Sequence, residues 1–409
     1  MTTADSVGQE SLLHNQDYLR YWFARAVSTL GSQATYVAFP LMALGTFQSA
    51  LAASLVTACS YGSTLVVGLH AGVLADQFDR KWLMVSVEVL QAMAMLAMAT
   101  MLLTGWVPLA GACAVAFVNG ALFAVYASCS NAALPDLVGP DLLPRAIARN
   151  QMRDFALAVA GPPLGGLLIV WSIEAPFLFN VGTLLLAAVL TATIRRPLPS
   201  GRAAVRGRAS LAGVRLVLRD RVLRWATLFL AGQSVVLTSS FFAVVALLAN
   251  RSSAVTMGVA LACQAGGGLL GSLAATRIHA RVGGTQLLLA QGFSWTAGLG
   301  LLAVTVNPVV VCVVLGFMWL TVPATRIAFQ THLTVVTPPG VRGRVQSVVF
   351  LVQSTGTAIG PLLAGVVISA TSDISTLLVT CLISGMVTVS CVLLPNFRAR
   401  LTWRRNLDE

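Results

Sequence analysis

The feature that most constrains this chain is a regular succession of long apolar stretches separated by short polar gaps. A helix needs about 20 mostly apolar residues to cross a bilayer, and twelve stretches reach that length. We therefore expect an all-α membrane protein with twelve transmembrane helices. The predicted spans are residues 18–46, 51–75, 83–104, 107–133, 146–171, 174–194, 223–248, 255–277, 284–305, 308–331, 345–370 and 374–395.

The composition supports a membrane protein and argues against a nucleic-acid-binding protein. Of the 409 residues, 57% are hydrophobic and 10% are charged, whereas a soluble domain usually carries about 25% charged residues. The net charge is +12, and Lys81 is the only lysine. A basic balance can indicate nucleic-acid binding. Here the arginines lie in the gaps between apolar stretches, so we expect no nucleic-acid partner and a surface that faces the lipid bilayer.

The arginines also predict the orientation of the chain, because cytoplasmic loops of membrane proteins are enriched in Lys and Arg. With the N-terminus in the cytoplasm, Arg251 is the only basic residue in the predicted outside loops. We expect both termini to be cytoplasmic, in a bacterial-type inner membrane. The predicted inside gaps hold Arg80, Lys81, Arg145, Arg277, Arg281, Arg342 and Arg344, besides a basic link and tail.

That basic link divides the chain into two parts. Pro197, Pro199 and Gly201 interrupt the helical pattern, and a series of arginines follows. From Leu211 the pattern becomes amphipathic, which predicts a short helix on the cytoplasmic leaflet. The predicted units are an N-terminal six-helix bundle (1–194), a linker with this helix (195–222), a C-terminal six-helix bundle (223–395) and a basic cytoplasmic tail (396–409).

An internal repeat explains why there are two bundles. Gly161-Pro162 recurs as Gly360-Pro361, and Arg145 recurs as Arg344, each at a separation of 199 residues. Similar residues at one constant offset indicate duplication of a six-helix unit.

The end of the second span and the gap after it contain the motif Gly72-Val73-Leu74-Ala75-Asp76-Gln77-Phe78-Asp79-Arg80-Lys81. It resembles the loop between helices two and three of the major facilitator superfamily. The resemblance implies two pseudo-symmetric bundles and a gating role for Gly72, Asp76, Arg80 and Lys81. Asp76 would face the positive N-terminal end of helix eleven and hold the cytoplasmic side shut. The matching residue of the second half is Ala275, so a second latch is weakened or lost.

Two further patterns narrow the resemblance. Gly161, Pro162 and Gly165 resemble the glycine–proline motif of exporters in this superfamily. Proline bends a helix, and the GxxxG spacing allows another helix to pack closely. The stretches 21–32 and 131–138 resemble the branch that contains macrolide-type efflux pumps and the enterobactin exporter. The region 117–122 lacks the arginine that many drug–proton antiporters carry in helix four, so a relay built on it is not available.

Ionisable residues inside a span are expensive, so each is a candidate for function. They are Arg25, Glu88, Arg149, Arg153, Asp154 and Arg326. We expect Asp154, with Glu88 second, to bind the coupling proton. Arg153 should point about 100° away from Asp154 around the helix, so the two need not pair.

The resemblance also implies a central cavity between helices one, four, seven and ten. Their mid-depth residues are mostly aromatic and amide side chains, which suit a large, amphipathic, neutral or weakly anionic ligand. The candidate cavity residues are Arg25, Gln33, Tyr36, Asn119, Phe123, Tyr126, Gln233, Trp319 and Arg326, with Phe241 and Phe242 beside them.

We therefore expect a monomeric, proton-coupled exporter of an amphipathic small molecule, such as a drug or natural product, and no enzyme. A siderophore exporter, a lysophospholipid carrier and a non-transporting membrane scaffold or receptor are the alternatives. There is no GxxxxGK[ST] sequence for an ATP-driven pump. The 4 histidines are scattered, and the 7 cysteines lie in apolar stretches without CxxC spacing, so we expect no metal site and no cofactor.

Overall fold

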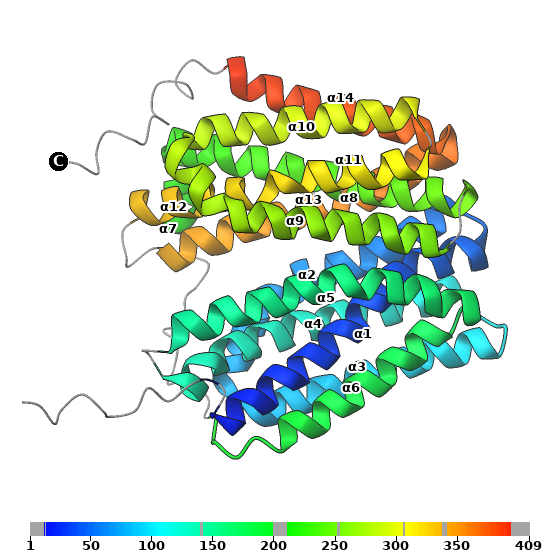
Figure 1. The fold of residues 1–409 in the computed structure, drawn as a ribbon, viewed down its shortest axis with the longest axis vertical. Helices are drawn as coiled ribbons and strands as arrows, with labels where there is room; N and C mark the ends of the chain where they lie inside the picture. Colours follow the sequence, from blue (N-terminus) through cyan, green and yellow to red (C-terminus); the bar gives the residue numbers. More distant parts are fainter. Residues whose placement is uncertain are drawn as a thin grey trace, which may run out of the picture.

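The computed structural model describes residues 12, 14–139, 142–198, 211–251, 254–305, 307–337 and 342–393. Within these ranges the structure consists of helices and contains no strand (Figure 1). The helices are α1 (Gln16–Phe47), α2 (Ala50–Gln77), α3 (Arg80–Leu103), α4 (Leu109–Val138), α5 (Leu143–Trp171), α6 (Ala175–Ala192), α7 (Leu211–Arg219), α8 (Arg221–Arg251), α9 (Ala254–Arg281), α10 (Gly284–Val304), α11 (Pro308–Leu320), α12 (Val322–Val336), α13 (Arg342–Ala370) and α14 (Asp373–Leu393).

The long helices agree with the predicted spans. Eleven segments in the described ranges are long and apolar enough to cross a membrane. The helix α1 is not among them because it is richer in polar residues, although it has 32 residues. With α1 the structure contains the twelve predicted spans, so the predicted fold class is confirmed.

One predicted span is divided. The segment expected at 308–331 breaks at Thr321 into α11 and α12. Pro323 follows at the first turn of α12. Proline has no amide hydrogen to donate to the preceding turn, which explains why the helical ladder is interrupted here.

Local capping fixes where several helices begin. The side chain of Asn15 accepts a hydrogen bond from the amide of Tyr18 and starts α1. Asp79 accepts in the same way from Trp82 at the start of α3. These short polar side chains satisfy amide groups that have no partner inside the helix.

The helices form two halves that face each other. In Figure 1, α1 to α6 make up one half and α8 to α14 the other, with α2 and α5 packed against α13 and α9. The repeat is visible in these four helices, because α2 and α9 have 28 residues each and α5 and α13 have 29 each. The contact of α2 with α13 and that of α5 with α9 are therefore equivalent under the internal duplication.

Among the described residues, the halves are joined more tightly at one end than at the other. We name the end where α7 lies the α7 end and the other the far end (Figure 1). Toward the far end, Val37 of α1 belongs to a core cluster of the second half, and Phe242 and Ala364 belong to a cluster of the first half. At the α7 end, the described core clusters contain residues of one half each.

Glycines permit the close approach at the far end. A Cβ added to Gly365 of α13 would collide with Ser54 of α2. A Cβ added to Gly258 of α9 would lie 2.7 Å from the carbonyl oxygen of Pro162 in α5. Because both contacts join the two halves, the backbones are in direct contact there.

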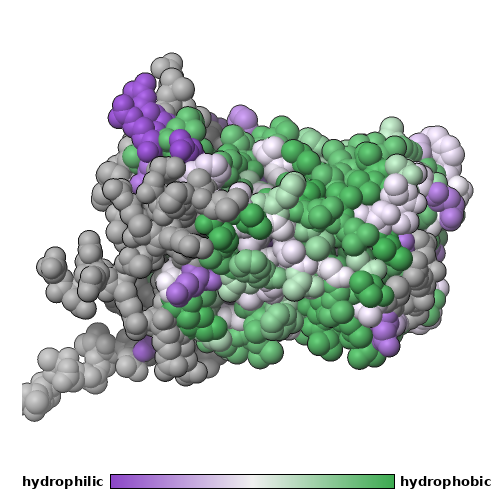
Figure 2. Space-filling view, turned by 90° about the horizontal axis from the view of Figure 1, so that it is seen from above, coloured by the Kyte–Doolittle hydropathy of each residue, from purple (hydrophilic) through white to green (hydrophobic). Residues whose placement is uncertain are grey.

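The outer surface is that of a membrane protein. Figure 2 shows hydrophobic side chains across the middle of one face, with hydrophilic residues gathered toward the two ends. Large apolar side chains on different helices are more than half exposed, as expected where lipid replaces water. Examples are Met93, Val189, Val313 and Leu382. The chain is therefore a multi-pass membrane protein.

The short helix α7 is amphipathic. Val217 is buried, whereas Val214 and Leu218 are exposed. The helix packs against α8 and α13, and Val217 contributes to the core cluster that these helices form with α12. The exposed apolar side chains suit the predicted position on the surface of a leaflet.

Candidate functional site

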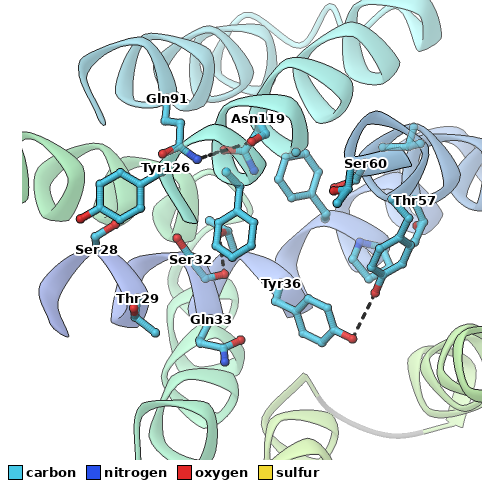
Figure 3. Close-up of a pocket in the computed structure, with 18 of the residues that line it drawn as sticks. Ser28, Thr29, Ser32, Gln33, Tyr36, Thr57, Ser60, Gln91, Asn119 and Tyr126 are labelled. Carbon is cyan, nitrogen blue, oxygen red and sulfur yellow. Dashed lines mark hydrogen bonds between the residues drawn. The ribbon is translucent and has the colours of Figure 1, made fainter. Parts of the chain in front are cut away.

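A cavity of about 470 Å³ lies within the first half (Figure 3). Its walls come from α1 to α5, and Phe241 of α8 is the one described lining residue of the second half. Most of the lining side chains can form hydrogen bonds. The lining residues are Arg25, Ser28, Thr29, Ser32, Gln33, Thr35, Tyr36, Phe39, Pro40, Val56, Thr57, Ser60, Tyr61, Thr64, Gln91, Asn119, Gly120, Phe123, Tyr126, Asp154 and Phe241.

The helix α1 supplies one complete wall. Its polar residues recur every three or four positions, from Arg25 through Ser28 and Ser32 to Tyr36, so they share one face of the helix. In Figure 3, the labelled residues of α1 follow one another along this wall. At about 1.5 Å per residue, the face runs roughly 16 Å from its charged end to its aromatic end. This polar face also explains why α1 is less apolar than the other spans.

Aromatic rings close the far end of the cavity. The hydroxyl groups of Tyr36 and Tyr61 lie 3.2 Å apart and form a hydrogen bond. The ring centroid of Tyr36 is 4.8 Å from that of Phe241. The second half therefore reaches the cavity at the place where the two halves meet.

The wall opposite α1 is formed by α3 and α4. The amide of Gln91 donates to the side-chain oxygen of Asn119 over 3.3 Å, so each holds the other in place (Figure 3). A Cβ added to Gly120 would collide with Ser60 and Ser63 of α2. This close packing of α2 on α4 brings Ser60 to the same cavity.

Arg25 marks the charged end. Its guanidinium group lies over the ring of Tyr126, 5.1 Å from the centroid. Among the described residues, no carboxylate lies within ion-pair distance of it and no hydrogen bond from it is found. Arg25 therefore presents a cation to the cavity without a protein anion bound to it.

Glu88 does not line the cavity, but its neighbour Tyr126 does. Glu88 is 0% exposed, and its Oε2 accepts a hydrogen bond from Thr191 of α6 over 3.1 Å. Its Oε1 has no hydrogen-bond partner in the described part of the chain. Tyr126 and Arg25, which both line the cavity, are its electrostatic neighbours. A buried carboxyl group is thus one side chain removed from the cavity.

Asp154 lines the cavity but is already paired. Its Oδ1 accepts from Nε and Nη2 of Arg153 at 3.0 and 2.8 Å. The expectation that these neighbours point apart is therefore wrong. The long arginine side chain bends back, while Nη1 donates to the carbonyl oxygen of Trp22 on α1. The hydrogen bond to Trp22 holds the guanidinium group in a position where it also reaches Asp154.

Three of the predicted cavity residues lie elsewhere. Gln233 is buried in α8, and neither of its side-chain polar atoms has a partner among the described residues. Trp319 packs on Trp295 with ring centroids 6.3 Å apart. Arg326 is exposed on α12. The other candidates, Arg25, Gln33, Tyr36, Asn119, Phe123 and Tyr126, line the cavity together with Asp154.

The basic pair of the predicted gating motif braces the first half. Arg80 forms an ion pair with Asp136 of α4 at 2.7 Å. Lys81 donates to the carbonyl oxygen of Ile194 over 2.8 Å. The structure does not describe the surroundings of Gly72 or the side chain of Asp76, so the latch to helix eleven stays a prediction.

The glycine–proline motif of α5 sets the position of α1. The helix is continuous through Pro162 and Pro163. A Cβ at Gly161 would collide with Gln33, and a Cβ at Gly165 with the backbone of Ala34. The two glycines therefore allow α1 to pack closely on α5 at the level where Gln33 enters the cavity.

Several lining residues were not anticipated from the sequence. Thr29, Thr57, Ser60, Tyr61 and Gln91 are examples. The three- and four-residue spacing of polar side chains along α1 is a signal that could have identified those of that helix. No group of His, Cys, Asp or Glu that could hold a metal ion occurs among the residues that the structure describes.

In sequence comparison a family model matches most of the chain, and a related protein matches less than half of it. A family model described as Major Facilitator Superfamily matches residues 21–361. The uncharacterized MFS-type transporter YkuC of Bacillus subtilis (strain 168) is 23% identical over 188 residues, covering 46% of this chain and 43% of that protein. The match therefore spans less than half the length of this relative.

Two solved structures share the arrangement of helices. The nucleoside transporter NupG superposes with a TM-score of 0.75 at 12% identity, covering 94% of this chain and 98% of that chain. A bacterial homologue of the iron transporter ferroportin, in an inward-facing state, superposes with a TM-score of 0.70 at 18% identity, covering 93% and 99%. At these identities the likeness shows the fold alone.

Proposed function

This chain belongs to the major facilitator superfamily, and from that premise we propose that it couples proton movement to the export of an amphipathic small molecule. Membership makes it a membrane transporter of this type. The observation that carries the proposal is the combination of a polar and aromatic cavity with a buried carboxyl group one side chain away. The first can hold a solute, and the second can hold a proton.

The cavity chemistry favours an amphipathic solute. Of the 21 lining residues, 15 carry a polar atom in the side chain, and rings of Tyr36, Phe123 and Phe241 provide apolar surface. A pocket with a few aromatic faces and many hydrogen-bonding groups suits a ligand that has a planar apolar part and polar substituents. It does not suit a long acyl chain, which disfavours a lysophospholipid carrier.

Between the two acidic candidates, the surroundings favour Glu88 as the proton-binding residue. Asp154 is already engaged in an ion pair with Arg153 at 2.8 Å. Glu88 is buried without an ion-pair partner among the described residues, and a charged group in that position is costly. A residue that must gain and lose a proton during transport fits the second environment better.

The contacts between halves support alternating access. If the α7 end faces the cytoplasm, as the arginine distribution predicts, the tight far end faces outward. The cavity would then be sealed from the outside and would receive its solute from the cytoplasm. Rocking of one half against the other about the cavity would expose it to the other side.

Export, rather than import, is supported by the resemblance of the α5 motif to the motif of exporters. A siderophore exporter is the second candidate, and Arg25 favours it because an unpaired cation can bind an acidic ligand. Both candidates export a solute and differ in its charge.

Everted membrane vesicles with an acidified interior test the proposal. We expect one chemical class from a panel of macrolides, dyes, catecholates and lysolipids to release protons from vesicles that contain the protein. Vesicles without the protein are the control. If no compound of the panel releases protons, while transport of a labelled compound proceeds without a proton gradient, proton coupling is excluded.

A further inference from the structure

We propose that the transported molecule is an amphipathic anion whose carboxylate or phosphate group binds Arg25. The inference deepens the proposed function by naming the chemical class of its substrate. It rests on the charges, the unused hydrogen-bond donors and the positions of the rings around the cavity.

Near this end of the cavity three arginines outnumber two carboxyl groups, those of Asp154 and of the buried Glu88, which is an electrostatic neighbour of Arg25. Arg149 and Arg153 both lie over the ring of Trp22, at 5.4 and 5.5 Å from its centroid. Arg153 is occupied by Asp154. A cationic ligand would have to compete with Arg153 for Asp154 and approach Arg25 as well, whereas an anion is attracted by the same groups.

Arg25 is positioned to bind an anion. A guanidinium group offers parallel N–H donors that match a carboxylate or phosphate. The contact with the ring of Tyr126 orients its plane without using those donors. Since no acceptor for them is found among the described residues, a ligand can supply one.

The next turn of α1 offers additional groups. Ser28 and Thr29 line the cavity beside Arg25, followed by Gln33. No hydrogen bond from these three side chains is found within the described ranges. Their hydroxyl and amide groups can therefore bind polar substituents next to the anionic group (Figure 3).

The far end of the cavity is suited to the apolar part of the same molecule. The rings of Tyr36 and Phe241 contact each other there, with centroids 4.8 Å apart, and Phe123 lines the cavity with 46% of its surface exposed. The polar face of α1 between Arg25 and Tyr36 is about 16 Å long. An elongated molecule with an anionic group at one end and an aromatic ring system at the other matches this arrangement.

Binding of a matched set of biphenyl compounds to the purified protein in lipid nanodiscs tests this proposal. The set consists of 4-biphenylcarboxylate, 4-biphenylyl phosphate, 4-biphenylcarboxamide and 4-biphenylmethylamine. Empty nanodiscs give the lipid background. We expect the carboxylate or the phosphate to bind about tenfold more tightly than the amide, and the better of the two identifies the anionic group.

Variants then test whether Arg25 causes the preference for the anions over the amide. Arg25→Gln should abolish it, Arg25→Lys should keep part of it, and Arg145→Gln, at an exposed position of α5, should leave it unchanged. Size-exclusion profiles show whether each variant is folded. Equal binding of anions and amide, absence of binding by every compound, or a preference that survives Arg25→Gln would each overturn the proposal.

The same compounds separate this proposal from the proposed function. If the anions bind through Arg25 but release no protons from everted vesicles, the anion site stands and proton-coupled export of these compounds fails. If a neutral compound releases protons and no anion is preferred, export stands and the anion site fails.

Discussion

Three helices contribute the groups around the carboxyl group of Glu88. Thr191 donates to it from α6, and Tyr126 and Arg25 are its electrostatic neighbours from α4 and α1. We expect Glu88→Gln to abolish proton release in everted vesicles, because the amide keeps the size of the side chain but cannot bind and release a proton. Ligand binding in nanodiscs should persist.

Asp154→Asn is the matched comparison, since it removes a carboxylate that lines the same cavity but is paired with Arg153. We expect this variant to retain proton release. The opposite result, with release lost in Asp154→Asn and kept in Glu88→Gln, would assign the proton to Asp154.

The individual residues were predictable to different degrees. Depth along a helix can be counted from the sequence, which is why Gln33, Tyr36 and Asn119 were expected at the cavity. The direction of a side chain depends on neighbouring helices. Trp319 is turned toward Trp295, and Arg153 folds back onto Asp154 because Trp22 of another helix accepts its hydrogen bond. No single-sequence pattern contains that information.

At the scale of single elements, the contact of α1 with α5 depends on two glycines. A Cβ at Gly165 would collide with the carbonyl oxygen of Ala34. We expect Gly165→Ala to lower the free energy of unfolding by about 1–3 kcal/mol, the usual cost of an overpacked contact. Thermal unfolding in detergent measures the change.

Gly182→Ala is the control for this prediction. It introduces the same methyl group into α6, where a Cβ has nothing within 4 Å. The midpoint temperature of thermal unfolding should therefore equal that of the wild type. Equal midpoints for Gly165→Ala and the wild type would show that the helices can separate at no cost, which contradicts the close contact.

The helices themselves followed from the apolar stretches, because a bilayer imposes both their length and their composition. The expected start and end of the first span, 18–46, differ little from Gln16–Phe47. The break at Thr321 was missed, although Pro323 follows it. Proline is frequent in membrane helices without ending them, so the residue alone does not predict an interruption.

For the whole molecule, the duplication predicts symmetry that the cavity does not share. The helix pairs α5 with α9 and α2 with α13 are equivalent under the repeat. The cavity, however, is lined by five helices of the first half and by Phe241 of the second. Duplication preserves the fold, because packing needs only apolar surface and small residues, whereas the polar residues of a site can diverge in each half.

The unequal packing of the two ends predicts from which side the cavity is open. Ser32 lines the cavity, so a Ser32→Cys variant, with the 7 native cysteines replaced by alanine, can be labelled with a membrane-impermeant maleimide. We expect faster labelling from the α7 end, because the halves pack tightly at the other. A separate Arg145→Cys variant marks the α7 end, since Arg145 is exposed and lies in the first turn of α5.

Loosening the far end should change this preference. Gly365→Val adds atoms where a Cβ already collides with Ser54 of the other half, so it should favour the state in which that end is open. Labelling of Ser32→Cys from the far side should then increase. Gly266→Val, at a glycine of α9 with nothing within 4 Å of an added Cβ, should not change it. If Gly365→Val leaves the rates from both sides as they were, this contact does not control access, and the seal must depend on the aromatic contact between Tyr36 and Phe241.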